Sequence, residues 1–240
     1  MVTDLLSLFL VILVALSASI VQASAGMGYT LLGAPILSII DPELVPVPML
    51  ASSILLSLLI GLREREAVAF GELGWAFIGY LPGSLAATFL LASITTSRLP
   101  LVLAGSVLVV VFLSLFRLRV PINRFSLLLV GALAGFMGTT SAIAGPPIAL
   151  LYQNRENASI RATLAFFFVG AALLSVSVLA LRGHISERAI LYTLLLLPVT
   201  AAGFFLSGRM LKYLSKRSLR PAVLALSAAA ALLLIWRTLA

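Results

Sequence analysis

Charged residues divide this sequence into long uncharged runs, and the lengths of these runs limit what the chain can fold into. The runs cover 5–40, 44–62, 73–97, 99–116, 125–154, 162–181, 189–208 and 221–236. Six of them match the roughly 17–25 residues of helix that cross a bilayer once. Only 10% of the residues are charged and 62% are hydrophobic, which is more apolar surface than a soluble domain can bury. The sequence therefore predicts an all-α integral membrane protein whose surface contacts the lipid bilayer.

Two of the runs, 5–40 and 125–154, are too long for one straight crossing and too short for two. At about 1.5 Å per residue they would extend about 54 and 45 Å, whereas a hydrocarbon core is about 30 Å thick. Both runs contain residues that break helices, namely Gly26, Gly28, Gly33 and Pro35 in the first and Gly135, Gly138, Gly145, Pro146 and Pro147 in the second. We therefore interpret each run as a broken helical hairpin rather than one kinked helix.

The sequence also predicts two inverted-topology repeats, each a broken helical hairpin plus three transmembrane helices. A shift of 112 residues superimposes Gly26 on Gly138 and Pro35 on Pro147. The first repeat is expected over 1–119, with its hairpin at 5–40 and spans at 44–62, 72–97 and 99–116. The second is expected over 120–240, with its hairpin at 125–154 and spans at 162–181, 189–208 and 219–236. If each hairpin returns to its starting side, each repeat crosses three times, and this odd number inverts the second repeat.

The distribution of basic residues sets the expected orientation. With both hairpins returning, twelve of the 16 Lys and Arg residues share one face, and Arg98, Arg182, Arg188 and Arg237 lie on the other. The positive-inside rule places the larger group in the cytoplasm. We therefore expect a multi-pass protein of the cell inner membrane with both termini outside the cytoplasm. This topology accounts for the net charge of +8, and no basic face interleaved with aromatic residues predicts a nucleic-acid partner.

The two breaks are the candidate substrate site. Irregular backbone at membrane depth is tolerated only in protein or at a wet cavity, and free helix N-termini favour anions. Broken helices in inverted repeats bind substrate near the midplane, between the repeats. The candidate binding residues are Gln22, Ser24, Gly26, Gly28, Tyr29, Thr30, Ser52, Ser53, Gly138, Thr139, Thr140, Ser141, Arg161 and Thr163. The alternative is that the hydroxyls bond to carbonyls of their own helices and that Arg161 anchors its helix end by snorkelling.

The sequence offers little for catalysis or for a cofactor. Cysteine is absent, the single His184 lies in an expected loop, and no pair of carboxylates lies within a span. We expect neither an enzyme nor a metal site, and no cofactor. The carboxylate nearest to a span interior is Glu72, at the edge of its span. This pattern favours an anion driven by the membrane potential over coupling to protons or sodium.

The hairpin motifs resemble the TauE/SafE sulfite exporter family. Three segments carry the resemblance, which covers essentially the whole chain: Gly26-Met27-Gly28 to Ala34-Pro35-Ile36, Gly138 to Gly145-Pro146-Pro147-Ile148, and Arg161-Ala162-Thr163. It implies a bacterial or archaeal inner-membrane transporter of sulfur-containing anions, such as sulfite, sulfoacetate or other organosulfonates, commonly moved outward. A carrier of carboxylates and a non-transporting membrane scaffold or accessory subunit are the alternatives. Whether the chain forms a homo-oligomer stays open.

Overall fold

The computed structural model describes residues 4–68, 70–95, 98–115, 121–152, 157–210 and 216–239. All regular elements in these ranges are helical, which confirms the predicted all-α class. The elements are α1 (Leu5–Ala25), α2 (Tyr29–Ile40), η1 (Pro42–Leu44), α3 (Val47–Arg63), η2 (Arg65–Ala67), α4 (Phe70–Ser93), α5 (Leu99–Leu115), α6 (Arg124–Ser141), α7 (Gly145–Tyr152), α8 (Asn157–Leu181), α9 (Glu187–Met210) and α10 (Lys216–Leu239).

Seven helices of the described chain are long and apolar enough to cross a membrane. They are α1, α3 with η1, α4, α6, α8, α9 and α10, whereas α2 and α5 are apolar but shorter. Large apolar side chains lie exposed on their outer surfaces, among them Phe89, Phe205 and Trp236. A water-soluble protein rarely exposes so much apolar surface, and in a bilayer these side chains contact lipid. The chain is therefore a multi-pass membrane protein.

Each of the two long apolar runs is interrupted in the structure. α1 ends at Ala25, and the chain turns through Gly26 (φ 86°) and Gly28 (φ 137°) before α2 begins at Tyr29. Glycine suits both positions because the left-handed region is unfavourable for residues with a Cβ atom. In the second run α6 ends at Ser141, Ala142 takes a φ of 62°, and α7 begins at Gly145.

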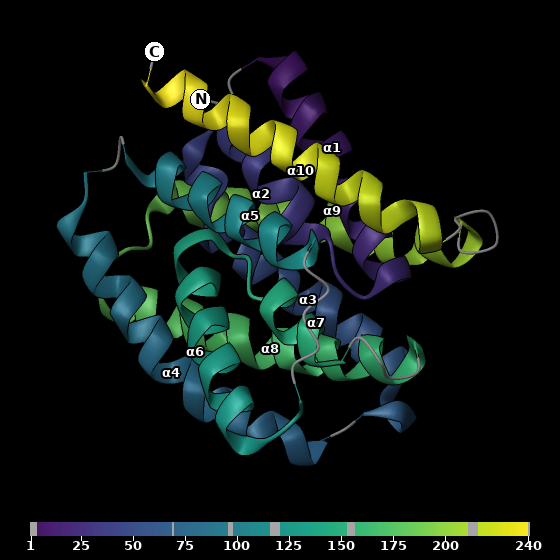
Figure 1. Cartoon of the computed structure of the whole chain (residues 1–240). Coiled ribbons are helices and arrows are strands. Elements are labelled where there is room, and N and C mark those ends of the chain that lie inside the picture. The colour runs from purple at the N-terminus through teal and green to yellow at the C-terminus, as the bar shows by residue number, and fades with distance from the viewer. Residues whose placement is uncertain are drawn as a thin grey trace.

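Contacts between helix ends show that the helices run between two opposite ends of the molecule. At one end Arg63 Nη2 donates to the carbonyl of Ala23 near the close of α1, at 2.7 Å. At the other end Arg237 Nη1 donates to the carbonyl of Ile39 near the close of α2, at 2.6 Å. α2 therefore returns to the end where α1 begins. Both chain termini also lie at that end (Figure 1).

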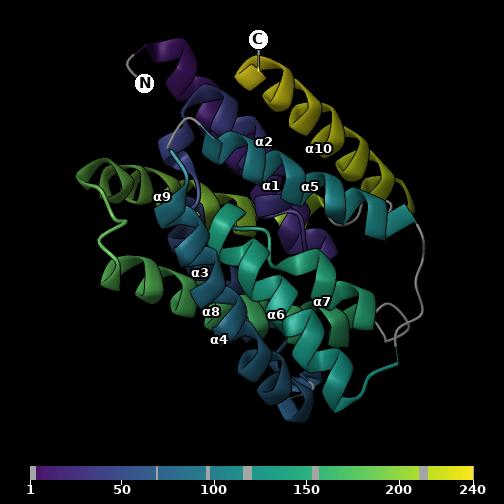
Figure 2. The same ribbon diagram turned by 60° about the vertical axis from the view of Figure 1, so that its left-hand side comes forward.

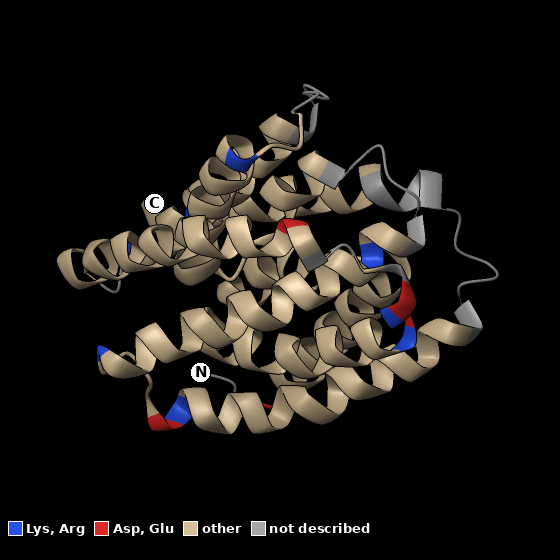
Figure 3. Ribbon diagram, turned by 90° about the horizontal axis from the view of Figure 1, so that it is seen from below, with Lys and Arg blue, Asp and Glu red and all other residues tan. Residues whose placement is uncertain are grey.

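Charged residues gather near these two ends and leave most of the helical length free of charge (Figure 3). Arg63, Arg65, Arg124 and Arg161 belong to the end where α1 closes, because α4 and α8 start there. Arg98, Arg182, Arg188 and Arg237 belong to the end that holds the termini. The structure thus separates the described basic residues into the two groups that the sequence suggested. The side of the membrane that each group faces stays a prediction.

The packing of the helices repeats when α1 to α5 are matched in order with α6 to α10. α1 packs on α9 as α6 packs on α4, α2 packs on α10 as α7 packs on α5, and α3 packs on α8. Figure 2 shows α1, α2, α5 and α10 as one group, beside a second group that includes α3, α4, α6, α7 and α8. Equivalent helices run in opposite directions. This pattern supports the predicted inverted repeats, which stay a prediction.

The helices α4 and α6 pack closely, and their backbones touch through glycines on both sides. A Cβ atom at Gly79 or Gly83 would clash with backbone carbonyls of α6, and one at Gly131 or Gly135 would clash with carbonyls of α4. Small residues spaced four apart allow membrane helices to approach in this way. The crossing fixes Tyr80, which lies between Gly79 and Gly83, against the closing half of α6.

Candidate functional site

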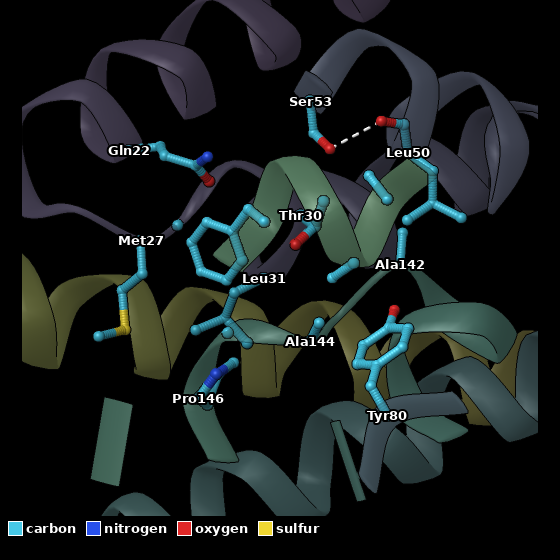
Figure 4. Close-up of a pocket in the computed structure, with 15 residues that line it drawn as sticks. Gln22, Met27, Thr30, Leu31, Leu50, Ser53, Tyr80, Ala142, Ala144 and Pro146 are labelled. Carbon is cyan, nitrogen blue, oxygen red and sulfur yellow. Dashed lines mark hydrogen bonds between the residues drawn. The ribbon is translucent and has the colours of Figure 1, made fainter. Parts of the chain in front are cut away.

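A small central cavity lies between the two breaks, with about 20 Å³ of space for water-sized molecules. Its lining comes from α1 and α2, α3, α4, the α6–α7 break and α8 (Figure 4). The lining residues are Gln22, Met27, Gly28, Thr30, Leu31, Leu50, Ser53, Tyr80, Ala142, Ala144, Gly145, Pro146, Phe168, Ala171 and Ala172. Among these described residues none is charged, so the wall is mostly apolar with a few uncharged polar groups.

The first turn of α2 supplies most of the hydrogen-bond donors on this wall. The first N–H groups of a helix have no partner within the helix and carry the positive end of its dipole. Here the Tyr29 N–H donates to Gln22 Oε1 at 3.0 Å, and the Leu32 N–H donates to the Gly28 carbonyl at 2.9 Å. Thr30 and Leu31 lie between these two and line the cavity. Their N–H groups are therefore the ones left for a ligand.

Gln22 holds this turn in place. Its side chain is 4% exposed and spans the break, accepting from Tyr29 at one end while Nε2 donates to Ser57 Oγ at 3.3 Å. The amide thus joins α1, α2 and α3 at the cavity wall. Since Nε2 carries two hydrogens and Ser57 accepts one of them, the amide keeps one hydrogen that a ligand could accept.

The second break has a different chemistry from the first. α7 begins with Gly145, Pro146 and Pro147, and proline has no N–H group. The start of α7 therefore offers few donors, and Ala142, Ala144 and Pro146 contribute apolar surface to the cavity wall. The two breaks do not contribute equally to the cavity.

Four of the predicted site residues line the cavity, namely Gln22, Gly28, Thr30 and Ser53. Ser53 Oγ donates to the Leu50 carbonyl at 2.7 Å, so it can only accept from a ligand. Tyr29 and Ser52 are buried behind the wall, with 2.8 Å between the Tyr29 hydroxyl and Ser52 Oγ.

The predicted hydroxyls of the second break serve the protein itself. Thr140 Oγ1 donates to the Phe136 carbonyl at 2.8 Å, and Ser141 Oγ donates to the Met137 carbonyl at 2.7 Å. These bonds within one helix are the alternative considered for Ser and Thr in membrane helices. Thr139 instead bonds to side chains of α4 and α8, at 2.7 Å each from Ser84 Oγ and Ser175 Oγ.

The remaining predicted residues surround the cavity without lining it. Gly138 leaves room for the Tyr80 hydroxyl, with which a Cβ atom would clash. Gly26 packs against Arg161, whose Cγ lies 2.7 Å from the position of a Cβ at Gly26. Ser24 is buried, and its Oγ has no hydrogen-bond partner in the described structure, while Thr163 is buried in α8.

Arg161 is held in an ion pair at one end of the molecule. Its Nε lies 2.8 and 2.9 Å from the two carboxylate oxygens of Glu64, which also receives Arg63 Nη2 at 3.3 Å. Since Glu64 balances one of the two arginines, the cluster keeps a single positive charge near the α1–α2 break. Glu64 was not among the residues predicted from the sequence.

The sequence also did not predict the apolar lining or Tyr80. Leu50, Phe168 and Ala171 carry no signal that separates them from lipid-facing residues. Tyr80 did carry a signal, since it is a polar aromatic residue in the middle of a span and precedes Leu81-Pro82, a pair that recurs as Leu197-Pro198.

Comparison with known proteins places this geometry in a family. A search of curated proteins and a search of solved structures each found no match. The family model described as Sulfite exporter TauE/SafE matches residues 11–234, which is nearly the whole chain. The broken helices, the uncharged cavity and this match agree, and the chain belongs to the TauE/SafE sulfite exporter family.

Proposed function

We propose that this protein carries small sulfur-containing oxyanions, such as sulfite, sulfoacetate or other organosulfonates, across the inner membrane and binds them in the central cavity. Membership of a family of membrane sulfite exporters gives the substrate class its support. The observation that supports the binding position is the first turn of α2, where Thr30 and Leu31 line an uncharged cavity and the N–H groups on either side of them are already bonded.

The donors at this turn suit an oxyanion. Sulfite and sulfonate oxygens accept several hydrogen bonds, and Thr30 supplies a hydroxyl beside its N–H group. Hydrogen bonds to a charged group contribute about 1.5–3 kcal/mol each, so two or three of them hold an anion without a buried cation. Neutral donors also let the anion leave again, as a transporter requires.

Transport is outward and driven by the membrane potential. A potential of 100 mV contributes about 2.3 kcal/mol for each charge moved, which expels an anion from the negative cytoplasm. The end that carries Arg63, Arg65, Arg124 and Arg161 faces the cytoplasm in this proposal, and both termini face outward. The single net positive charge of the Arg63–Glu64–Arg161 cluster attracts the anion to that end.

Purified protein in liposomes tests the proposal. Sulfite and methanesulfonate should leave the vesicles in response to an imposed potential, with acetate and chloride as controls. Flux that requires a proton gradient would contradict the potential-driven mechanism. Equal flux of acetate would favour a carboxylate carrier, and no flux above that of empty vesicles would favour a scaffold.

A further inference from the structure

Four buried hydroxyls form an unbroken chain that starts at the cavity wall. The Tyr80 hydroxyl lies 2.7 Å from Ser175 Oγ, which lies 2.7 Å from Thr139 Oγ1, which lies 2.7 Å from Ser84 Oγ. All four residues have no exposed surface. They come from α4, α8 and α6, so the chain crosses three helices that are distant in sequence.

Tyr80 is the member of this chain that lines the cavity. Its ring is held by edge contact with Phe167, at 5.8 Å between ring centroids, and by the close α4–α6 crossing. Its hydroxyl occupies the space left by the missing side chain of Gly138. Figure 4 shows Tyr80 across the cavity from Gln22 and Ser53, with its hydroxyl turned toward Ala142. The donors of α2 and the Tyr80 hydroxyl thus border the same space from different helices.

The number of hydrogens in the chain decides what Tyr80 can do. Each hydroxyl carries one hydrogen, and three bonds among four hydroxyls use only three of them. In each bond either oxygen can be the donor. When Ser84 donates to Thr139, Thr139 to Ser175 and Ser175 to Tyr80, the phenolic hydrogen lies outside these three bonds, and within the cluster Thr139 is the other hydroxyl near enough to compete for it.

Tyr29 shows the opposite arrangement, although it is equally buried. Its hydroxyl bonds to Ser52, whose own hydrogen goes to the Pro48 carbonyl at 2.7 Å. A carbonyl only accepts, so Tyr29 must donate to Ser52 and its hydrogen is committed. The bonds described for Ser84, Thr139 and Ser175 include none to a carbonyl, so the Tyr80 hydrogen is not committed in this way.

We propose that Tyr80 donates its phenolic hydrogen to the oxyanion in the cavity, and that Ser175, Thr139 and Ser84 are positioning residues that turn this hydrogen toward it. The inference rests on the proposed function and adds a binding residue to it. A phenol is more acidic than an aliphatic alcohol and is therefore the strongest hydroxyl donor of the chain. An oxyanion beside the Tyr80 hydroxyl favours the direction of hydrogen bonding in which Ser84, Thr139 and Ser175 donate toward Tyr80 and Tyr80 donates to the anion.

The test measures anion affinity through the anion-dependent rise in unfolding temperature of the purified full chain, with sulfite and methanesulfonate as probes. Tyr80→Phe removes only the hydroxyl and should weaken both affinities about 10- to 100-fold, the loss of one hydrogen bond to a charge. Ser175→Ala and Thr139→Val leave the phenol in place but break the chain, and should weaken affinity less. Tyr192→Phe is the matched control, because its hydroxyl bonds to Asp41 at one end of the molecule, and should keep wild-type affinity.

If the four linked hydroxyls only stabilise the fold, the result is different. Tyr80→Phe, Ser175→Ala and Thr139→Val would then lower the unfolding temperature without anion but keep wild-type affinity, and this outcome overturns the inference alone. If Tyr80→Phe does not fold, wild-type affinity in both Ser175→Ala and Thr139→Val overturns it. A wild-type protein that binds neither probe overturns the proposed function, and the inference falls with it.

Discussion

Arg161 Nε lies 2.8 Å from one carboxylate oxygen of Glu64 and 2.9 Å from the other, and this ion pair joins the start of α8 to the end of α3. The two helices belong to different predicted repeats. Both side chains are mostly buried, at 15% and 14% exposure. The pair therefore ties the two halves of the chain together beside the α1–α2 break.

Loss of this pair should destabilise the protein. Glu64→Gln leaves the guanidinium of Arg161 with no opposite charge in a mostly buried place, which should lower the free energy of unfolding by about 1–3 kcal/mol. Thermal unfolding in detergent measures the effect. Glu43→Gln is the control, since Glu43 pairs with Arg188 at a more exposed site, where an ion pair contributes about 0–1 kcal/mol. Equal effects of the two substitutions would contradict the prediction.

The α4–α6 crossing should not tolerate a methyl group. Gly83→Ala places a Cβ atom against the Ala132 carbonyl, and the helices must separate to accept it. We expect a loss of about 1–3 kcal/mol in stability, as for other overpacked sites. Gly105→Ala in α5 is the matched control, because nothing lies within 4 Å of its Cβ position and alanine favours helix. An unfolding temperature of Gly83→Ala at or above that of Gly105→Ala would refute this reading of the crossing.

Anion binding should depend both on the hydrogen bonds of Gln22 and on the absence of charge at this position. Gln22→Glu keeps an oxygen that accepts from the Tyr29 N–H but places a negative charge at the cavity wall. Sulfite and methanesulfonate binding should fall more than 10-fold, because like charges in a poorly solvated site repel strongly. Gln22→Leu removes the bonds without adding charge and should reduce binding less. Flux assays and anion-dependent unfolding temperatures give the comparison, and an active Gln22→Glu protein would argue against an anion at this wall.

Acid should weaken the contact between η1 and α9 through Asp41. Burial acts to raise the pKa of Asp41, but bonds from the Tyr192 hydroxyl at 2.7 Å and the Glu43 N–H at 3.0 Å outweigh it and lower the pKa below its ordinary value of 3.8. A lowered folded-state pKa means that Asp41 stabilises the fold above its unfolded pKa and that this contribution disappears as pH falls through the folded pKa.

Asp41→Asn should therefore cost stability near neutral pH and reduce the loss of stability below about pH 4. Unfolding temperatures across that range measure both effects. Tyr192→Phe removes one of the bonds that lower this pKa and should move the acid transition to higher pH. An unchanged acid transition in both variants would show that Asp41 does not contribute to it.

The class of the fold was predictable from the spacing of charges. Apolar runs of about 20 residues match spanning helices, which satisfy every backbone group in lipid within their own segment. The interruptions at Gly26–Gly28 and before Gly145 lie where breakers cluster. The packing of α4 on α6 was not predictable, because it depends on which of several glycine-containing helices meet in space.

The site was harder to predict than the fold. A Ser or Thr in a helix can always donate to a carbonyl one turn back, so Thr140 and Ser141 look the same in sequence whether or not they bind a ligand. Tyr80 bonds to Ser175, 95 residues away, which bonds in turn to Thr139, and no spacing rule joins the three. Arg161 was a predicted binding residue, but its partner Glu64 lies 97 residues away in the sequence and neutralises its charge.

The prolines at the start of α7 have one more consequence, for the cargo. A cavity built by two equivalent breaks would accept a symmetrical ligand either way round. Here one pole donates hydrogen bonds from α2 and the other presents Ala144, Pro146 and Phe168. An organosulfonate has the same polarity, with a charged head and a carbon tail. Under the proposed function its head binds at Thr30 and its tail at the proline wall, and we expect the protein to carry such a molecule in one fixed orientation.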